Sequence, residues 1–161
     1  MPSEKDLGRN IKPEFFDTIN YAICQTANEY LGSKASAFFV RVGEHHLEEA
    51  LRRGFLRIDK EEKPLQNLIK IAKYLESTGY MEKIFITKLS ENEAIVEMHG
   101  VSVTESSVGL LKAGKQPSHY MTNIMLAALR KIGIEAELRD VDFDEKSRRF
   151  TEHWKILQPS R

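Results

Sequence analysis

The sequence predicts an α+β fold in which helices cover one antiparallel sheet made of two hairpins. Three observations support this prediction. Apolar residues recur at three- and four-residue spacing in several stretches, which is typical of helices with one buried face. Two other stretches are rich in β-branched and aromatic residues, and a polar turn divides each of them. Strands grouped as hairpins favour an antiparallel sheet over a parallel one, and the expected order is α-α-α-β-β-α-β-β.

Three helices are expected in the first half of the chain. Each begins near a proline or a serine, which are favoured at helix starts, and the first and third end at a glycine. The three stretches are 13–31, 33–53 and 64–78. Gly43 lies inside the second stretch and weakens it, because glycine costs roughly 1 kcal/mol in the interior of a helix.

The first hairpin follows these helices, where the apolar period changes to that of a strand. Its strands cover 80–89 and 94–99, on either side of a polar turn. The next segment, 100–115, has two glycines around a short apolar run, so we expect a loop with at most one helical turn.

The last helix and the second hairpin complete the predicted fold. Met121, Ile124 and Met125 repeat at helical spacing in the stretch 117–132, and Gly133 ends that helix. The period is two from Ile134 onward, and a polar turn divides the hairpin. We expect residues 80–99 and 134–156 to form one sheet, on which the helices 13–31, 64–78 and 117–132 pack.

Composition excludes several classes of protein. Lysine plus arginine and aspartate plus glutamate both total 24, so no net charge attracts nucleic acid. The single cysteine, Cys24, cannot form an internal disulfide and fits a reducing cytoplasm. No run approaches the roughly 18 apolar residues that a membrane span needs. We therefore expect a soluble cytoplasmic protein, with a loosely ordered tail over 1–12 and one domain over 13–161.

The last helix and hairpin resemble the C-terminal half of the vinyl-4-reductase family. The resemblance rests on Tyr120–Leu129, read as YMTNIMLAAL, and on Ile134–Leu138, read as IEAEL. The chain is also similar to the TRAPP vesicle-tethering subunits that share this fold. Together with haem-nitric-oxide-binding domains, these families form a superfamily of ligand-binding α+β domains. The resemblance implies that a small hydrophobic ligand is held between the helices and the sheet.

Some features of these families have no counterpart in the chain. Vinyl-4-reductase relatives place cysteines near the start of this helix and in the final hairpin, where this chain has His119 and His153. A cysteine metal site is therefore not implied. The haem-binding relatives carry a Tyr-x-Ser-x-Arg motif, whereas this chain has YMTNI from Tyr120 to Ile124. The sequence thus indicates no particular cofactor, which stays unknown at this stage, and it does not favour haem.

The inner face of the helix 117–132 is the predicted ligand site. Flexible methionines and a small alanine lie one turn apart there, and such a mixture can leave a cavity. Polar residues at the helix start would meet the head group of a hydrophobic ligand, aided by free N–H groups of the first turn. The predicted ligand-binding residues are Ser118, His119, Tyr120, Met121, Met125, Ala128 and Trp154. Ordinary core packing is the competing interpretation.

A homodimeric scaffold without a ligand is an alternative function. The first two helices carry the adjacent pairs Phe15–Phe16 and Phe38–Phe39. Both members of such a pair cannot face one core, so we expect one of each pair to be exposed or shared with a second copy. The expected partner is therefore another copy of the chain, in a twofold homodimer.

A metal-dependent enzyme is a further alternative. His45 and Glu49 lie four residues apart on one helical face, with Glu44 and Glu48 beside them, and this spacing can supply metal ligands. A solvated helix face with charge pairs is the simpler interpretation of the same residues. The chain has no nucleophile elbow, and the G-x4-G-K run from Gly109 lacks the serine or threonine that a phosphate loop requires.

Overall fold

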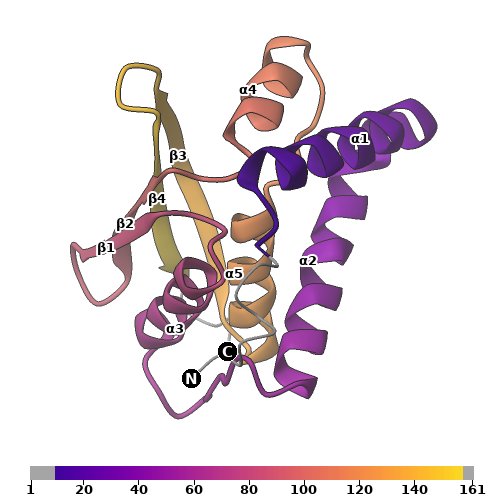
Figure 1. Cartoon of the computed structure of the whole chain (residues 1–161). Helices are drawn as coiled ribbons and strands as arrows, with labels where there is room; N and C mark the ends of the chain where they lie inside the picture. The colour runs from indigo at the N-terminus through magenta and orange to yellow at the C-terminus, as the bar shows by residue number, and fades with distance from the viewer. Residues whose placement is uncertain (1–9, 158–161) are drawn as a thin grey trace.

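The computed structural model describes residues 10–157 and has the predicted α+β architecture (Figure 1). Within this range the helices are α1 (Pro13–Leu31), α2 (Ala35–Arg52), α3 (Pro64–Ser77), α4 (Thr104–Lys112) and α5 (Tyr120–Lys131). The strands are β1 (Lys83–Lys88), β2 (Glu93–His99), β3 (Glu135–Asp144) and β4 (Arg149–Leu157). A 3₁₀ turn, Gly32–Lys34, joins α1 to α2. The tail expected over 1–12 falls mostly on residues outside the described range.

The four strands form one antiparallel sheet in the order β1-β2-β4-β3. The two strands of each hairpin pair with each other, β1 with β2 and β3 with β4. The pairing of β2 with β4 joins the two hairpins into a single sheet. Trp154 on β4 lies opposite Ala94 on β2 and Leu138 on β3, which places it at the centre of the sheet. The predicted antiparallel sheet of two hairpins is confirmed.

The main core lies between the sheet and the helices α3 and α5. The buried residues of β2 and β4 alternate along each strand, because successive side chains point to opposite faces of a sheet. Trp154, Met125 and Ala128 are completely buried in this core. The helix α2 packs along α5, on the side of α5 away from the sheet (Figure 1). These helices and the sheet therefore form successive layers.

The helix α1 packs on α2 and α4, and not on the sheet as the sequence analysis expected. A small cluster of Cys24, Ala27, Ala35, Phe39 and Leu110 fills the space between these helices. The buried residues of α1 are Asn20, Cys24 and Ala27, whereas the apolar stripe that the period of its sequence suggests, with Ile19, Ile23 and Tyr30, is exposed. A helical period indicates a buried face but not its partner, and here the partners are other helices.

The segment 104–112 is a helix of nine residues, where the sequence predicted a loop with at most one turn. Asp17 of α1 stabilises its first turn, because the Asp17 carboxylate accepts hydrogen bonds from the backbone N–H and the hydroxyl of Ser106, at 3.1 and 2.7 Å. Asn20 donates a further hydrogen bond to the Ser106 hydroxyl at 2.8 Å. The group that caps α4 is thus far away in sequence, and a local pattern cannot reveal it.

Gly43 has a packing role that the sequence analysis missed. A Cβ atom at this position would lie 2.7 Å from the Cβ of Asn123 and 2.8 Å from its carbonyl carbon. The absence of a side chain therefore allows α2 to approach the backbone of α5. This close approach brings residues one turn further along α2 to the start of α5.

The first two helices expose one phenylalanine of each adjacent pair, as predicted. Phe15 is 62% exposed and Phe38 is 40% exposed, whereas Phe39 is only 3% exposed. Ile19, Ile23 and Tyr30 add to the exposed apolar surface of α1. In the described part of the chain, no helix is long and apolar enough to cross a membrane.

Candidate ligand-binding site

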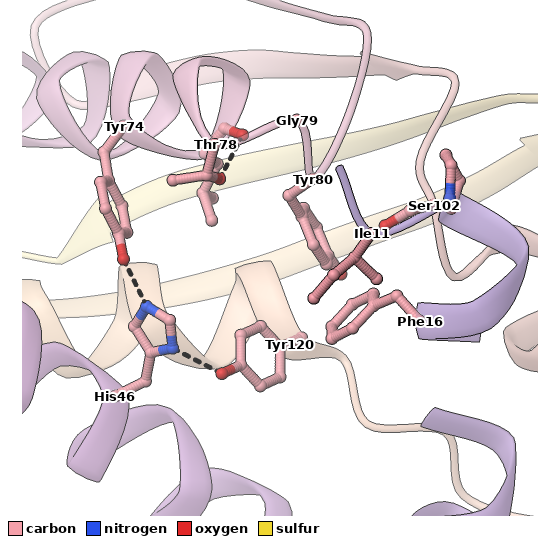
Figure 2. Close-up of a pocket in the computed structure, with 11 residues that line it drawn as sticks. Ile11, Phe16, His46, Tyr74, Thr78, Gly79, Tyr80, Ser102 and Tyr120 are labelled. Atoms are coloured by element: carbon pink, nitrogen blue, oxygen red, sulfur yellow. Dashed lines mark hydrogen bonds between the residues drawn. The ribbon is translucent and has the colours of Figure 1, made fainter. Parts of the chain in front are cut away.

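A cavity of about 260 Å³ lies where the start of α1, the middle of α2, the end of α3 and the start of α5 meet (Figure 2). Its wall is mainly aromatic and apolar, with Phe16, Tyr74, Tyr80, Tyr120, Ile11 and Leu75 among its residues. Pockets for small molecules are typically concave and mostly apolar, with volumes of roughly 300–1,000 Å³. This cavity is slightly smaller than that range, so it fits a small ligand.

His46 of α2 is the polar centre of this cavity. Its Nδ1 atom is hydrogen-bonded to the Tyr120 hydroxyl at 2.5 Å, and its Nε2 atom to the Tyr74 hydroxyl at 2.8 Å (Figure 2). The two tyrosines come from α5 and α3. One imidazole therefore connects three helices, and both of its nitrogens are occupied.

Burial keeps this network uncharged. It lowers the pKa of His46, and it raises the pKa of Tyr74 and that of Tyr120, the latter to about 12. A neutral imidazole has one N–H donor and one acceptor nitrogen, so one tyrosine accepts a hydrogen bond and the other donates one. The accepting tyrosine still has its own O–H to donate, and the donating one still has a lone pair. The network can thus offer both a donor and an acceptor to a ligand.

Ser102 adds a second polar group to the wall of the same cavity. Its hydroxyl oxygen is buried and has no hydrogen-bond partner among the residues that the structure describes. A buried hydroxyl without a partner costs roughly 1–3 kcal/mol. The oxygen itself is covered, so a bound molecule would reach it only after rotation of the Ser102 side chain.

A second cavity, of about 70 Å³, adjoins the first and shares Tyr80 and Tyr120 with it. The rings of these two tyrosines are 5.9 Å apart and tilted by 35°, and they form a wall between the cavities. The second cavity is lined on its far side by residues of α4, β3 and β4, including Glu152.

The structure divides the predicted ligand-binding residues into two groups. His119, Tyr120 and Met121 line the second cavity, and Ser118 is buried beside them, next to the Cys24 thiol of α1. Met125, Ala128 and Trp154 are completely buried in the main core and are not among the residues that line either cavity. The start of α5 therefore lies beside the cavities, and the rest of its inner face lies in the packed core.

His119 has a backbone conformation that is uncommon for residues other than glycine. It precedes α5 with φ of 43° and ψ of 44°, in the left-handed region. This conformation turns the chain sharply into the helix, where Asn123 donates a hydrogen bond to the Ser118 carbonyl at 2.9 Å. Such backbone strain is often found at functional sites.

Sequence reasoning missed His46, Tyr74, Tyr80 and Glu152 as site residues. His46 follows His45 in the polar run of the second helix, and nothing in the local pattern connects it with tyrosines that are 28 and 74 residues away. The sequence pattern does indicate that Glu152 is buried. It alternates with Trp154 and Ile156 along β4, so the period of two places it on the buried face.

The residues considered for a metal-dependent enzyme have other partners. The Glu49 carboxylate accepts hydrogen bonds from Arg52 and Arg53. The Nδ1 atom of His45 lies 3.5 Å from the Glu48 carboxylate on the exposed face of α2. No group of three or more potential metal ligands occurs among the side chains described in this structure.

The fold is similar to that of H-NOX proteins. No family model and no curated protein matches the sequence. Among solved structures, a variant of Tt H-NOX superposes with a TM-score of 0.57 at 10% identity, over 95% of this chain and 76% of that one. A variant of T. tengcongensis H-NOX superposes with a TM-score of 0.56 at 10% identity, over 95% of this chain and 78% of that one. K. algicida H-NOX superposes with a TM-score of 0.50 at 10% identity, over 77% of this chain and 64% of that one.

This similarity supports the predicted fold. Of the families named by the resemblance, the haem-nitric-oxide-binding domains have the matching structures, and the relation to vinyl-4-reductases and TRAPP subunits stays a prediction. At this level of identity, function and ligand do not follow from the fold.

The residues of the candidate site do not fit a haem. Haem distortion is described for the similar H-NOX proteins, and haem iron needs a free axial ligand such as a histidine nitrogen. Both nitrogens of His46 are occupied by tyrosine hydroxyls.

Proposed function

We propose that the protein is a ligand-binding domain for a small, flat, mainly apolar molecule with one hydrogen-bonding group. The ligand would occupy the cavity of about 260 Å³ between α1, α2, α3 and α5. The aromatic wall would cover its faces. Its polar group would meet the network of His46, Tyr74 and Tyr120. A regulatory role follows naturally, because the ligand would contact three helices at once.

The observation that carries the proposal is the neutral His46 between two tyrosine hydroxyls on the wall of an apolar cavity. Such a buried polar network costs stability unless all of its hydrogen bonds are made. Here it faces a cavity in which one donor and one acceptor are left for a ligand.

A pair of matched probes tests this proposal. We expect 1-naphthol, which has a hydroxyl, to bind more tightly than naphthalene, as measured by fluorescence titration. Tyr120→Phe should weaken 1-naphthol binding by about tenfold, because one hydrogen bond is worth roughly 1 kcal/mol or slightly more. Its effect on naphthalene should be small. Tyr30→Phe is the control, since Tyr30 is exposed on α1 and outside the cavity.

A blocking variant separates this cavity from other apolar surfaces. Thr78 lies on the exposed rim of the cavity, so Thr78→Trp should close the cavity without disturbing the core. Loss of binding of both probes in this variant would support the proposal. Equal binding of both probes by Thr78→Trp and the parent protein would overturn it, and so would no binding of either probe by the parent.

The exposed apolar surface of α1 and α2 supports a second candidate function, a homodimeric scaffold. Phe15, Ile19, Ile23, Tyr30 and Phe38 are all at least 40% exposed. Apolar surface of this kind often marks an interaction site. Sedimentation equilibrium should then give twice the monomer mass of 18.5 kDa, and Ile23→Glu should restore the monomer. A monomer at all concentrations would refute this function.

A further inference from the structure

Glu152 is a carboxylate on the buried face of the sheet. It is 5% exposed and alternates along β4 with Trp154 and Ile156, which belong to the core. Its Oε1 atom accepts a hydrogen bond from the Thr122 hydroxyl at 2.6 Å, and its Oε2 atom accepts one from the Trp154 indole N–H at 2.8 Å. These two neighbours fix the orientation of the carboxylate.

The hydrogen bonds of Glu152 leave its charge without compensation. Within residues 10–157 it makes no ion pair, and a carboxylate can accept about four hydrogen bonds, of which two are used. Burial raises the pKa of Glu152 and thereby disfavours the charged form. Isolated buried charges are costly, so buried carboxylates in proteins are usually paired with a cation.

The second cavity gives access to this carboxylate. Glu152 lies on its wall, and the neighbouring wall residues are mainly apolar, such as Met98 and Met121. The titratable groups that share this wall are Tyr80, Tyr120 and His119. Partial desolvation of its ring lowers the pKa of His119, although the residue as a whole is exposed, and burial raises the pKa of both tyrosines, so all three are uncharged near neutral pH. None of these groups therefore supplies the missing positive charge.

Residues of α4 and of the β3–β4 hairpin line one side of the second cavity. Leu111 of α4 and Val141 of β3 line it and are 52% and 55% exposed, so they form an apolar rim.

From this arrangement we infer that the second cavity is a site for a primary alkylammonium ion, with Glu152 as its anionic partner. A volume of about 70 Å³ accommodates a group of only a few non-hydrogen atoms, since one water occupies about 30 Å³ in the liquid. An ammonium group fits this space, and its N–H donors match the free acceptor positions of Glu152. The alkyl chain lies on the rim of Leu111 and Val141. This site does not depend on what occupies the larger cavity.

The single tryptophan of the chain provides a specific readout. Trp154 donates its indole N–H to Glu152, so the one indole N–H signal in an NMR spectrum reports on this carboxylate. We expect n-butylammonium to shift this signal in a saturable way. Butan-1-ol, which has the same chain but no charge, should bind at least tenfold more weakly. Butyltrimethylammonium has no N–H donor and a bulkier head, so it should bind as weakly as butan-1-ol.

Two variants complete the test. Glu152→Gln keeps the size of the side chain, and it should reduce n-butylammonium affinity at least tenfold while leaving butan-1-ol unaffected. Asp144→Asn is the control for unspecific attraction, since Asp144 is outside the cavity. It should change the n-butylammonium affinity less than twofold. Equal affinity of the parent protein for n-butylammonium and butan-1-ol would overturn the inference, even if the Gln variant did not fold. Unchanged affinity in a folded Gln variant would also overturn it.

Discussion

Replacement of Gly43 by alanine should destabilise the protein, although alanine is the better helix former. In an exposed helix interior this change stabilises by roughly 0.5–1 kcal/mol. At Gly43 the new Cβ would lie 2.7 and 2.8 Å from the Cβ and carbonyl carbon of Asn123. Rotation of a side chain cannot relieve a contact with backbone, so α2 must move away from α5. Overpacking of this kind costs about 1–3 kcal/mol.

The movement should also weaken the network in the candidate site. His46 follows Gly43 by one turn of α2, and its hydrogen bond to Tyr120 joins the same two helices. Loss of that bond adds roughly 1 kcal/mol. The expected net effect of Gly43→Ala is a destabilisation of about 1–3 kcal/mol. In a chain of this length, this corresponds to a decrease in Tm of roughly 2–12 °C.

Thermal unfolding followed by circular dichroism measures this effect, and Gly109→Ala is the matched control. Gly109 lies in α4, and a Cβ built there meets nothing within 4 Å. The control should therefore be stabilised by about 0.5–1 kcal/mol, so the two variants should differ in sign. If Gly43→Ala were as stable as Gly109→Ala, the close approach of α2 to α5 and the explanation of the His46 position would be wrong.

Three further predictions concern buried residues. Because burial lowers the pKa of His46 below 6.5, the free energy of unfolding should decrease as the pH falls below about 6.5, and His46→Gln should remove part of this slope in urea titrations. The pH dependence that Glu152 adds to the free energy of unfolding has the opposite sign. Burial raises the pKa of Glu152 above 4.5, so its contribution to stability is most favourable below that pH and is lost as the pH rises through the raised pKa. Glu152→Gln should therefore gain stability relative to the parent protein as the pH rises, and a constant difference would contradict this. Ala128→Trp should destabilise by about 3 kcal/mol or more, because Ala128 is completely buried in a packed core. A fully stable Trp variant would instead indicate free volume along α5, as the sequence-based hypothesis implied.

Local pattern alone predicted which segments form helices and strands. Proline and glycine boundaries predicted the limits of α1, α3 and α5. The periods of α3 and α5 also predicted their buried faces, because an amphipathic helix shows its buried face in its own sequence. The period of α1 did not, since its buried residues are Asn20, Cys24 and Ala27. The hairpins were equally clear, since each pair of strands is joined by a short turn. Residues 104–112 were the exception, because α4 depends on a cap from Asp17, which lies about 90 residues earlier in the chain.

The candidate site was only partly accessible to the same reasoning. The start of α5 was selected because polar residues precede an apolar helix, and His119 and Tyr120 do line a cavity. Glu152 could have been identified from the alternation of β4 with Trp154. His46 could not, because its surroundings depend on how closely α2 approaches α5.

The sequence by itself determined the type, order and approximate limits of the elements of this protein other than α4, because helix and strand periods depend on neighbours a few residues apart. Only the tertiary structure decided what those elements bring together. The missing side chain of Gly43 allows α2 to contact α5, and the contact places His46 between Tyr74 and Tyr120. Such a meeting of three helices depends on steric fit between distant residues, which no local period encodes.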